Sequence, residues 1–183
     1  MLVIADTDFS RAVESLTSAG FQEWTWSYGS SHPSFYKERS INDIYRRIVR
    51  DYQNLDQNSR RFLFPSQHQN TAKIALLPSS YAHIGAGPAL GHATDGNLIY
   101  PDGPSLLQSF VRTLVREPVV GMWTSTLDMW AIAYLYGELA LSDDSLDACD
   151  DVRAKLWFND SIERFGKGID RLTCTKRLGR VGT

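Results

Sequence analysis

A long stretch rich in glycine and proline in the middle of the chain limits its fold more than any other feature. Between Pro78 and Pro104 a long helix is excluded, because glycine and proline both disfavour the helical backbone. Structureless stretches of this length are uncommon in compact domains and are often functional. The stretch therefore separates two halves with different patterns and is a place to look for a site. Its helix-breaking residues are Gly85, Gly87, Pro88, Gly91, Gly96, Pro101 and Gly103.

The first residues predict a strand, a helix and a second strand. Residues 2–5 form a short apolar run, and Asp6 or Thr7 is suited to cap a helix whose apolar positions follow helical spacing. Gly20 stands where a glycine commonly ends a helix. Over residues 21–28 aromatic and polar residues alternate, which is typical of a half-buried strand.

A second helix and two more strands are predicted before the glycine-rich stretch. The helix begins near Ser40, and its apolar stripe extends to Tyr52. Two short apolar runs follow at 61–64 and 72–77, each next to a proline. We expect them to form adjacent, antiparallel strands joined by a surface loop.

The second half of the chain is predicted to be mainly helical. Helical spacing indicates one helix over 106–115, another beginning at Thr124 or Ser125, and a shorter one over 152–157. Strands first and helices afterwards indicate the α+β class, with a small mixed or antiparallel sheet packed with a mainly helical C-terminal half. No segment has the composition of a linker, so we expect a single domain over 1–183.

Composition limits the classes of partner. The formal net charge of −2 gives no overall field to attract nucleic acid, and no apolar stretch approaches the roughly 20 residues of a membrane span. A small molecule or nucleotide, or another protein, is therefore the expected partner. The two cysteines, Cys149 and Cys174, are too few for a disulfide scaffold, and the first residues lack the features of a secretion signal. We expect a cytoplasmic protein.

Two histidines and an aspartate in the glycine-rich stretch are the candidate catalytic residues. His83, His92 and Asp95 have the side chains of a facial triad for a divalent metal, or of an acid–base site in which Asp95 orients an imidazole. The alternative is structural: Asp95 and Gly96 form a turn, and the histidines bond to nearby backbone groups.

Two further groups are candidate ligand-binding residues. Ser79, Ser80 and Tyr81 follow a predicted strand, and strand ends open into clefts where polar side chains bind ligands. Near the C-terminus, Lys176 and Arg177 belong to a basic run without acidic residues that suits phosphate groups. The alternative for this run is a solvated chain end, with the acidic residues between 143 and 151 balancing its charge.

The opening of the chain resembles the small nucleotidyltransferase-like proteins over roughly its first 80 residues. The similarity lies in the strand and aspartate at residues 2–6, the helix that ends at residues 18–21, and the two strands at 61–64 and 73–77. In that family a pair of aspartates binds metal and a later strand supplies a third carboxylate. The resemblance therefore implies an α+β fold and a nucleotide ligand.

The chain departs from the family pattern at the catalytic positions. The acidic pair, Asp6 and Asp8, follows the first strand instead of occupying its start, and no glycine-serine turn precedes that strand. Ala75 stands where the third carboxylate would be expected. Because two-metal phosphoryl transfer needs clustered carboxylates, the resemblance implies either a chain truncated at its N-terminus or a degenerate member. We expect a protein that binds a ligand or partner without catalysis.

Two other functions stay open at this point. The first is a small-molecule enzyme that uses His83, His92 and Asp95. The second is a protein-interaction module that presents aromatic side chains such as Tyr28, Phe35 and Tyr36.

Overall fold

The chain forms two compact units, each with its own internal contacts. Unit 1 comprises Met1–Ala86 with Pro118–Trp123, and unit 2 comprises Gly87–Glu117 with Thr124–Thr183. The single domain over 1–183 stays a prediction. The computed structural model describes residues 1–30, 39–65, 73–85, 87 and 93–166.

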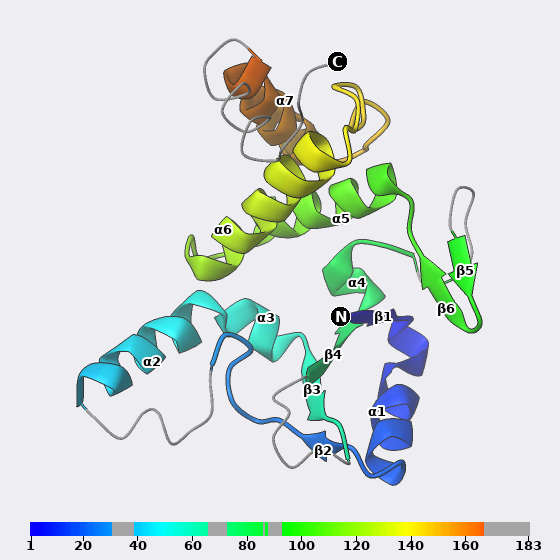
Figure 1. Cartoon of the computed structure of the whole chain (residues 1–183), viewed down its shortest axis with the longest axis vertical. Coiled ribbons are helices and arrows are strands. Elements are labelled where there is room, and N and C mark those ends of the chain that lie inside the picture. The colour runs from blue at the N-terminus through cyan, green and yellow to red at the C-terminus, as the bar shows by residue number, and fades with distance from the viewer. Residues whose placement is uncertain (31–38, 66–72, 86, 88–92, 167–183) are drawn as a thin grey trace. The chain divides into compact units, whose positions relative to one another are not determined.

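Unit 1 is built on a four-stranded mixed sheet in the order β1-β4-β3-β2 (Figure 1). Strand β4 pairs in parallel with β1 and antiparallel with β3, and β3 pairs antiparallel with β2. The α+β class and the antiparallel strand pair predicted from the sequence are confirmed. The strands are β1 (Leu2–Ile4), β2 (Gln22–Glu23), β3 (Arg60–Leu63) and β4 (Lys73–Pro78).

The helices of unit 1 lie close to the predicted positions. A 3₁₀ turn, η1 (Asp6–Asp8), leads into α1 (Phe9–Ser18), and Gly20 follows with a φ of 84° that suits glycine. The second predicted helix is α2 (Arg39–Asp51). Two shorter helices complete the unit, α3 (Gln53–Gln57) and α4 (Ser79–Ala82).

The strand predicted over residues 21–28 is wrong beyond its first residues. Only Gln22–Glu23 are paired as β2, and the Trp24 amide adds one further bond to the Arg61 carbonyl at 2.7 Å. After this the chain leaves the sheet, and the Trp26 ring packs on Tyr45 of α2 at a centroid distance of 5.2 Å. The alternating aromatic side chains thus pack on helices as well as on strands, which alternation alone does not distinguish.

A buried carboxylate holds the segment 118–123 against α2. The Asp51 side chain is 2% exposed and makes ion pairs with arginines of α2, including Arg50 at 2.9 Å. Its other oxygen accepts a hydrogen bond from the Met122 amide at 3.3 Å. A Cβ at Gly121 would lie 2.6 Å from the Asp51 Cγ, so only glycine fits there. This contact explains why a short segment distant in sequence belongs to unit 1.

Unit 2 contains a β-hairpin that the sequence did not predict. Strands β5 (Ala93–Asp95) and β6 (Leu98–Tyr100) pair antiparallel inside the glycine-rich stretch, which we had expected to lack strands. The two residues between them include Gly96, whose φ of 58° suits a tight hairpin turn. Each strand is only three residues long, too short for alternation to be recognised.

The remaining elements are helices, as predicted for the second half. Asp102 caps α5 (Gly103–Arg116) by accepting a hydrogen bond from the Ser105 amide at 2.8 Å. The next helix, α6 (Met122–Asp128), begins before the predicted Thr124 or Ser125. It continues as a π-helix, η3 (Met129–Glu138). The last helix is α7 (Val152–Gly166).

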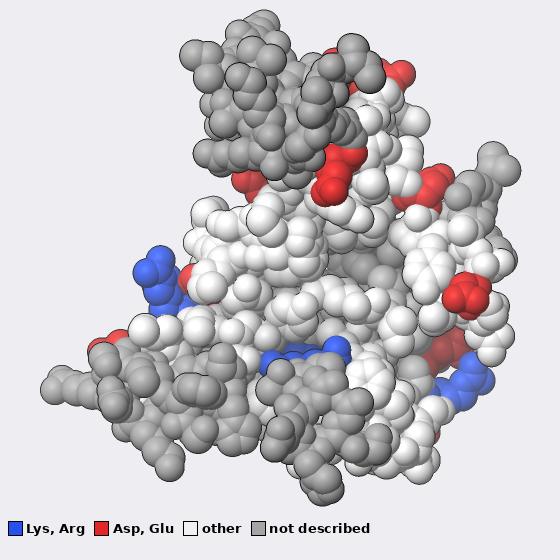
Figure 2. All heavy atoms as spheres, in the orientation of Figure 1, with Lys and Arg blue, Asp and Glu red and all other residues white. Residues whose placement is uncertain are grey.

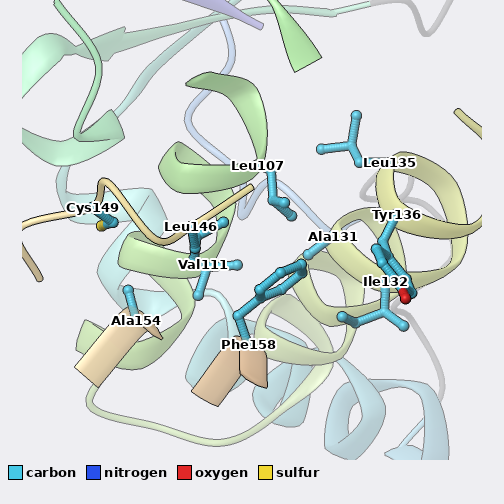
Figure 3. Packing of buried hydrophobic residues seen from close by; sticks show 10 residues of the cluster. All are labelled: Leu107, Val111, Ala131, Ile132, Leu135, Tyr136, Leu146, Cys149, Ala154 and Phe158. Carbon is cyan, nitrogen blue, oxygen red and sulfur yellow. The ribbon is translucent and has the colours of Figure 1, made fainter. Parts of the chain in front are cut away.

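The core of unit 2 lies among α5, η3 and α7 (Figure 3). The Phe158 side chain is fully buried and meets the Tyr136 ring edge-on at 5.8 Å. Ion pairs on the surface join α5 to the acidic stretch: Arg112 binds Asp150, and Arg116 binds Asp151. These acidic residues therefore have partners on a neighbouring helix. The core residues are Leu107, Val111, Ala131, Ile132, Leu135, Tyr136, Leu146, Cys149, Ala154 and Phe158.

Replacing Phe158 with alanine should destabilise the protein by about 3–5 kcal/mol, because the change leaves a cavity in a packed core. The matched control is Leu156→Ala on the same helix, where the side chain is 65% exposed, and this change should cost under about 0.5 kcal/mol. Urea unfolding followed by circular dichroism measures both. Equal destabilisation by the two variants would contradict the described core.

Candidate functional site

The parallel pairing of β1 and β4 creates the candidate site in unit 1. In this register Ile4 lies opposite Pro78, so the two strands end at the same edge of the sheet. Each strand is followed at once by a helical turn, η1 after β1 and α4 after β4. The carboxyl ends of parallel strands are a common location for ligand sites. The polar residues that follow both strands are thereby brought together.

Asp6 is bound by the two serines at this edge. Its carboxylate accepts hydrogen bonds from the Ser79 Oγ at 2.5 Å, the Ser80 Oγ at 2.5 Å and the Ser80 amide at 3.1 Å. The Ser79 hydroxyl, followed by that of Ser80, holds the pKa of Asp6 below its ordinary value, because hydrogen bonds to the charged form stabilise it. The carboxylate is solvent-exposed and carries its charge at neutral pH.

The remaining acceptor capacity of Asp6 defines what the edge can bind. An ionised carboxylate has about four acceptor positions, and the serines occupy three of them. The arrangement therefore offers a fixed negative charge that can accept a hydrogen bond from a hydroxyl or amino group of a ligand.

Tyr81, the next residue of α4, is held by the interior of unit 1. Its hydroxyl accepts a hydrogen bond from the Trp123 Nε1 at 3.0 Å, and Trp123 itself is 2% exposed. The Trp123 ring lies 6.1 Å from the Tyr52 ring and 6.2 Å from the Tyr28 ring. Tyr81 is thus a rigid neighbour of the serines. The same contacts make Tyr28 part of a packed aromatic group, unlike the surface aromatic expected from the sequence.

His83 follows α4 with an unusual backbone conformation. Its φ of 52° and ψ of 32° place it in the left-handed region, where residues other than glycine are uncommon. Such conformations are strained and recur at functional sites. His83 therefore places a strained backbone beside the edge that carries Asp6, Ser79 and Ser80.

Three of the predicted ligand-binding residues come together, and the predicted catalytic group is only partly described. Ser79, Ser80 and Tyr81 lie consecutively in α4, next to His83. Asp95 is exposed in β5 of unit 2. His92, Lys176 and Arg177 lie outside the described residues, as do Phe35 and Tyr36. The triad of His83, His92 and Asp95 thus stays a prediction. Within the described ranges, no three His, Cys, Asp or Glu side chains are grouped to hold a metal.

The role of Asp6 as the partner of the serines was missed by sequence reasoning. Asp6 and Ser79 are far apart in sequence, and only the parallel pairing of β1 with β4 reveals their contact. The sequence had instead paired Asp6 with Asp8. Asp8 forms an ion pair with Arg11 of α1 at 2.8 Å, on the helix surface.

On the face shown in Figure 2, the coloured acidic and basic side chains lie in small separate groups. Among the described helices, none combines the length and apolar character needed to cross a membrane. No family model, curated protein or solved structure matches the chain.

Removing both serine hydroxyls should raise the pKa of Asp6 toward its ordinary value. A carboxylate whose pKa is lower in the folded protein than in the unfolded chain stabilises the fold at pH values above its ordinary pKa. This stabilisation is lost as the pH falls through the lowered pKa. The Ser79→Ala/Ser80→Ala variant should therefore protonate Asp6 at higher pH, as measured by NMR titration of its carboxyl carbon. Thr17→Ala, which removes a hydroxyl bonded only within α1, is the control. An unchanged Asp6 titration in the double variant would contradict the described contacts.

Proposed function

We propose that the chain is a ligand-binding protein with a nucleotidyltransferase-like architecture that binds a nucleotide or nucleoside without transferring it. The binding site is the edge formed by Asp6, Ser79, Ser80 and Tyr81. An intracellular location is part of this proposal, as is the interpretation of the chain as a degenerate member of that family.

The observation that carries the proposal is the residue at the centre of β4. Ala75 is 2% exposed and occupies the position where the resemblance calls for a third carboxylate. A methyl group can neither bind a metal ion nor stabilise the charge of a phosphoryl group in transfer. The presence of Ala75 therefore supports a function in ligand binding and not in catalysis.

The hydrogen bonds of Asp6 support the same conclusion. A carboxylate that holds catalytic metal ions uses its oxygens as ligands, whereas three of the acceptor positions of Asp6 already serve Ser79 and Ser80. An aspartate at a strand end is well suited to accept hydrogen bonds from ribose hydroxyls. The sugar of a nucleotide is thus the part that this edge is proposed to hold.

Mg·ATP or adenosine should raise the melting temperature of the purified chain, since a ligand that binds the folded state stabilises it. Asp6→Ala should weaken this binding about 10- to 100-fold, because hydrogen bonds to charged groups contribute about 1.5–3 kcal/mol. Asp8→Ala removes a surface ion pair instead and should leave the affinity unchanged within about twofold. Thermal shift and titration calorimetry measure these effects.

A transfer assay separates binding from catalysis. Incubation with Mg·ATP should release no pyrophosphate above the background of the buffer. Nucleotide transfer that is abolished in Asp6→Ala or Asp8→Ala would refute the non-catalytic function. Absence of binding to both the nucleoside and the nucleotide would refute the proposed ligand.

A further inference from the structure

The sheet of unit 1 carries a second group of polar residues at the other end of β4. Paired residues in neighbouring strands point to the same face of a sheet, and residues two apart in one strand do so as well. Arg61 of β3 lies opposite Ala75, and Lys73 is two residues before Ala75 in β4. Trp24 extends the β2 pairing to a position opposite Arg61. Trp24, Arg61 and Lys73 therefore share one face.

The segment of backbone that contains Ser27 is held to this group at two points. The carbonyl of Ser30 accepts a hydrogen bond from the Lys73 Nζ at 2.9 Å. The amide of Tyr28 donates to Asp56, the carboxylate that pairs with Arg61. In the sequence, Ser27 lies between Trp24 and the anchored residues Tyr28 and Ser30, and it is only 5% exposed.

Three hydrogen-bond groups of these residues are buried without a partner in the described part of the chain. They are the Trp24 Nε1, the Ser27 Oγ and the Arg61 Nε. Buried polar groups are nearly always hydrogen-bonded to protein, water or an ion. The indole and guanidinium groups can only donate, and a hydroxyl can donate too. The group therefore calls for an acceptor.

The charges of the group are also unbalanced. Arg61, whose side chain is 8% exposed, is neutralised by Asp56 at 2.8 Å. Lys73 stands with its Nζ 4.3 Å from the centre of the Trp24 ring, and it takes part in none of the described ion pairs. Burial lowers the pKa of Lys73, the neighbouring Arg61 lowers it further, and Asp56 opposes the shift. An anion beside Lys73 would balance its charge and oppose the lowering of its pKa.

We propose that Trp24, Ser27, Arg61 and Lys73 form a binding site for a phosphate group. A phosphate has oxygens in several directions, which suits donors from β3, β4 and the segment after β2, and its charge balances that of Lys73. A water molecule also accepts hydrogen bonds, but it carries no charge to balance that of Lys73. Ala75, which lies opposite Arg61, adds no negative charge to this face, whereas a carboxylate at this position would repel the anion.

This site is separate from the edge that binds the proposed nucleotide. Lys73 is the first residue of β4, whereas Ser79 follows its last residue. At about 3.3 Å for each residue of a strand, the two positions lie on the order of 20 Å apart. The phosphate site therefore does not depend on the proposed function, and Asp6→Ala should leave it intact.

The indole proton of Trp24 gives the most direct test. In ¹H–¹⁵N spectra of the whole chain, inorganic phosphate should shift the Trp24 Nε1–H signal in a saturable way, whereas chloride at equal ionic strength should not. The signal is assigned with Trp24→Phe, which keeps an aromatic ring and removes the donor. No shift, or an equal shift with chloride, would overturn the proposal and leave water as the partner of these groups.

Variants and a second probe complete the experiment. Lys73→Met keeps an unbranched side chain that is one atom shorter and removes the charge, and it should weaken phosphate binding at least tenfold. Lys155→Met is the matched control, since Lys155 donates to the Asp147 carbonyl in unit 2, and it should have no effect. If Lys73→Met fails to fold, Ser27→Ala, which also removes a donor, should weaken binding. Unaltered binding in a folded Lys73→Met or Ser27→Ala would contradict the site.

A shift with ATP as well as phosphate identifies a phosphate ester as the ligand, whereas a shift with phosphate alone identifies the free anion.

Discussion

The pairing of β4 on both of its edges is the constraint on which unit 1 depends. On one side β4 runs parallel to β1, and this alone brings Asp6 to Ser79 and Ser80. On the other side it runs antiparallel to β3, which sets Lys73 on the same face as Arg61. A shift of register by one residue would move every side chain of β4 to the opposite face. The contacts of Asp6 with the serines and the grouping of Lys73 with Arg61 would then be lost together.

The two units are stabilised in different ways. The core of unit 2 is almost entirely apolar, with Phe158 at its centre. Unit 1 has buried apolar side chains as well, among them Phe62 and Leu76, but it also buries charged groups, namely the Arg61–Asp56 pair and the Asp51 carboxylate. Buried ion pairs contribute little net stability, because the desolvation of the charges offsets their attraction. The Asp51 carboxylate instead holds the segment 118–123 against α2, through the amide of Met122.

Patterns that are local in sequence were predicted well, and contacts between distant residues were not. Helix α1, which ends before Gly20, and helix α5, which begins beside Pro104, follow from spacing and from residues that begin or end helices. The parallel pairing of β1 with β4 could not be predicted, because nothing in residues 2–5 specifies a partner some 70 residues away. Hence Ser79 and Ser80 were recognised as ligand-binding candidates, whereas their contact with Asp6 was not.

We propose that the chain binds a nucleotide at the edge of β1 and β4 without transferring it. Mapping of backbone amide shifts in ¹H–¹⁵N spectra during a titration with Mg·ATP tests it most directly, with ³¹P spectra of the same sample following the nucleotide. We expect the largest amide shifts at Asp6, Ser79, Ser80 and Tyr81, with ATP intact throughout. Shifts that avoid these residues, or the appearance of pyrophosphate, would contradict the account.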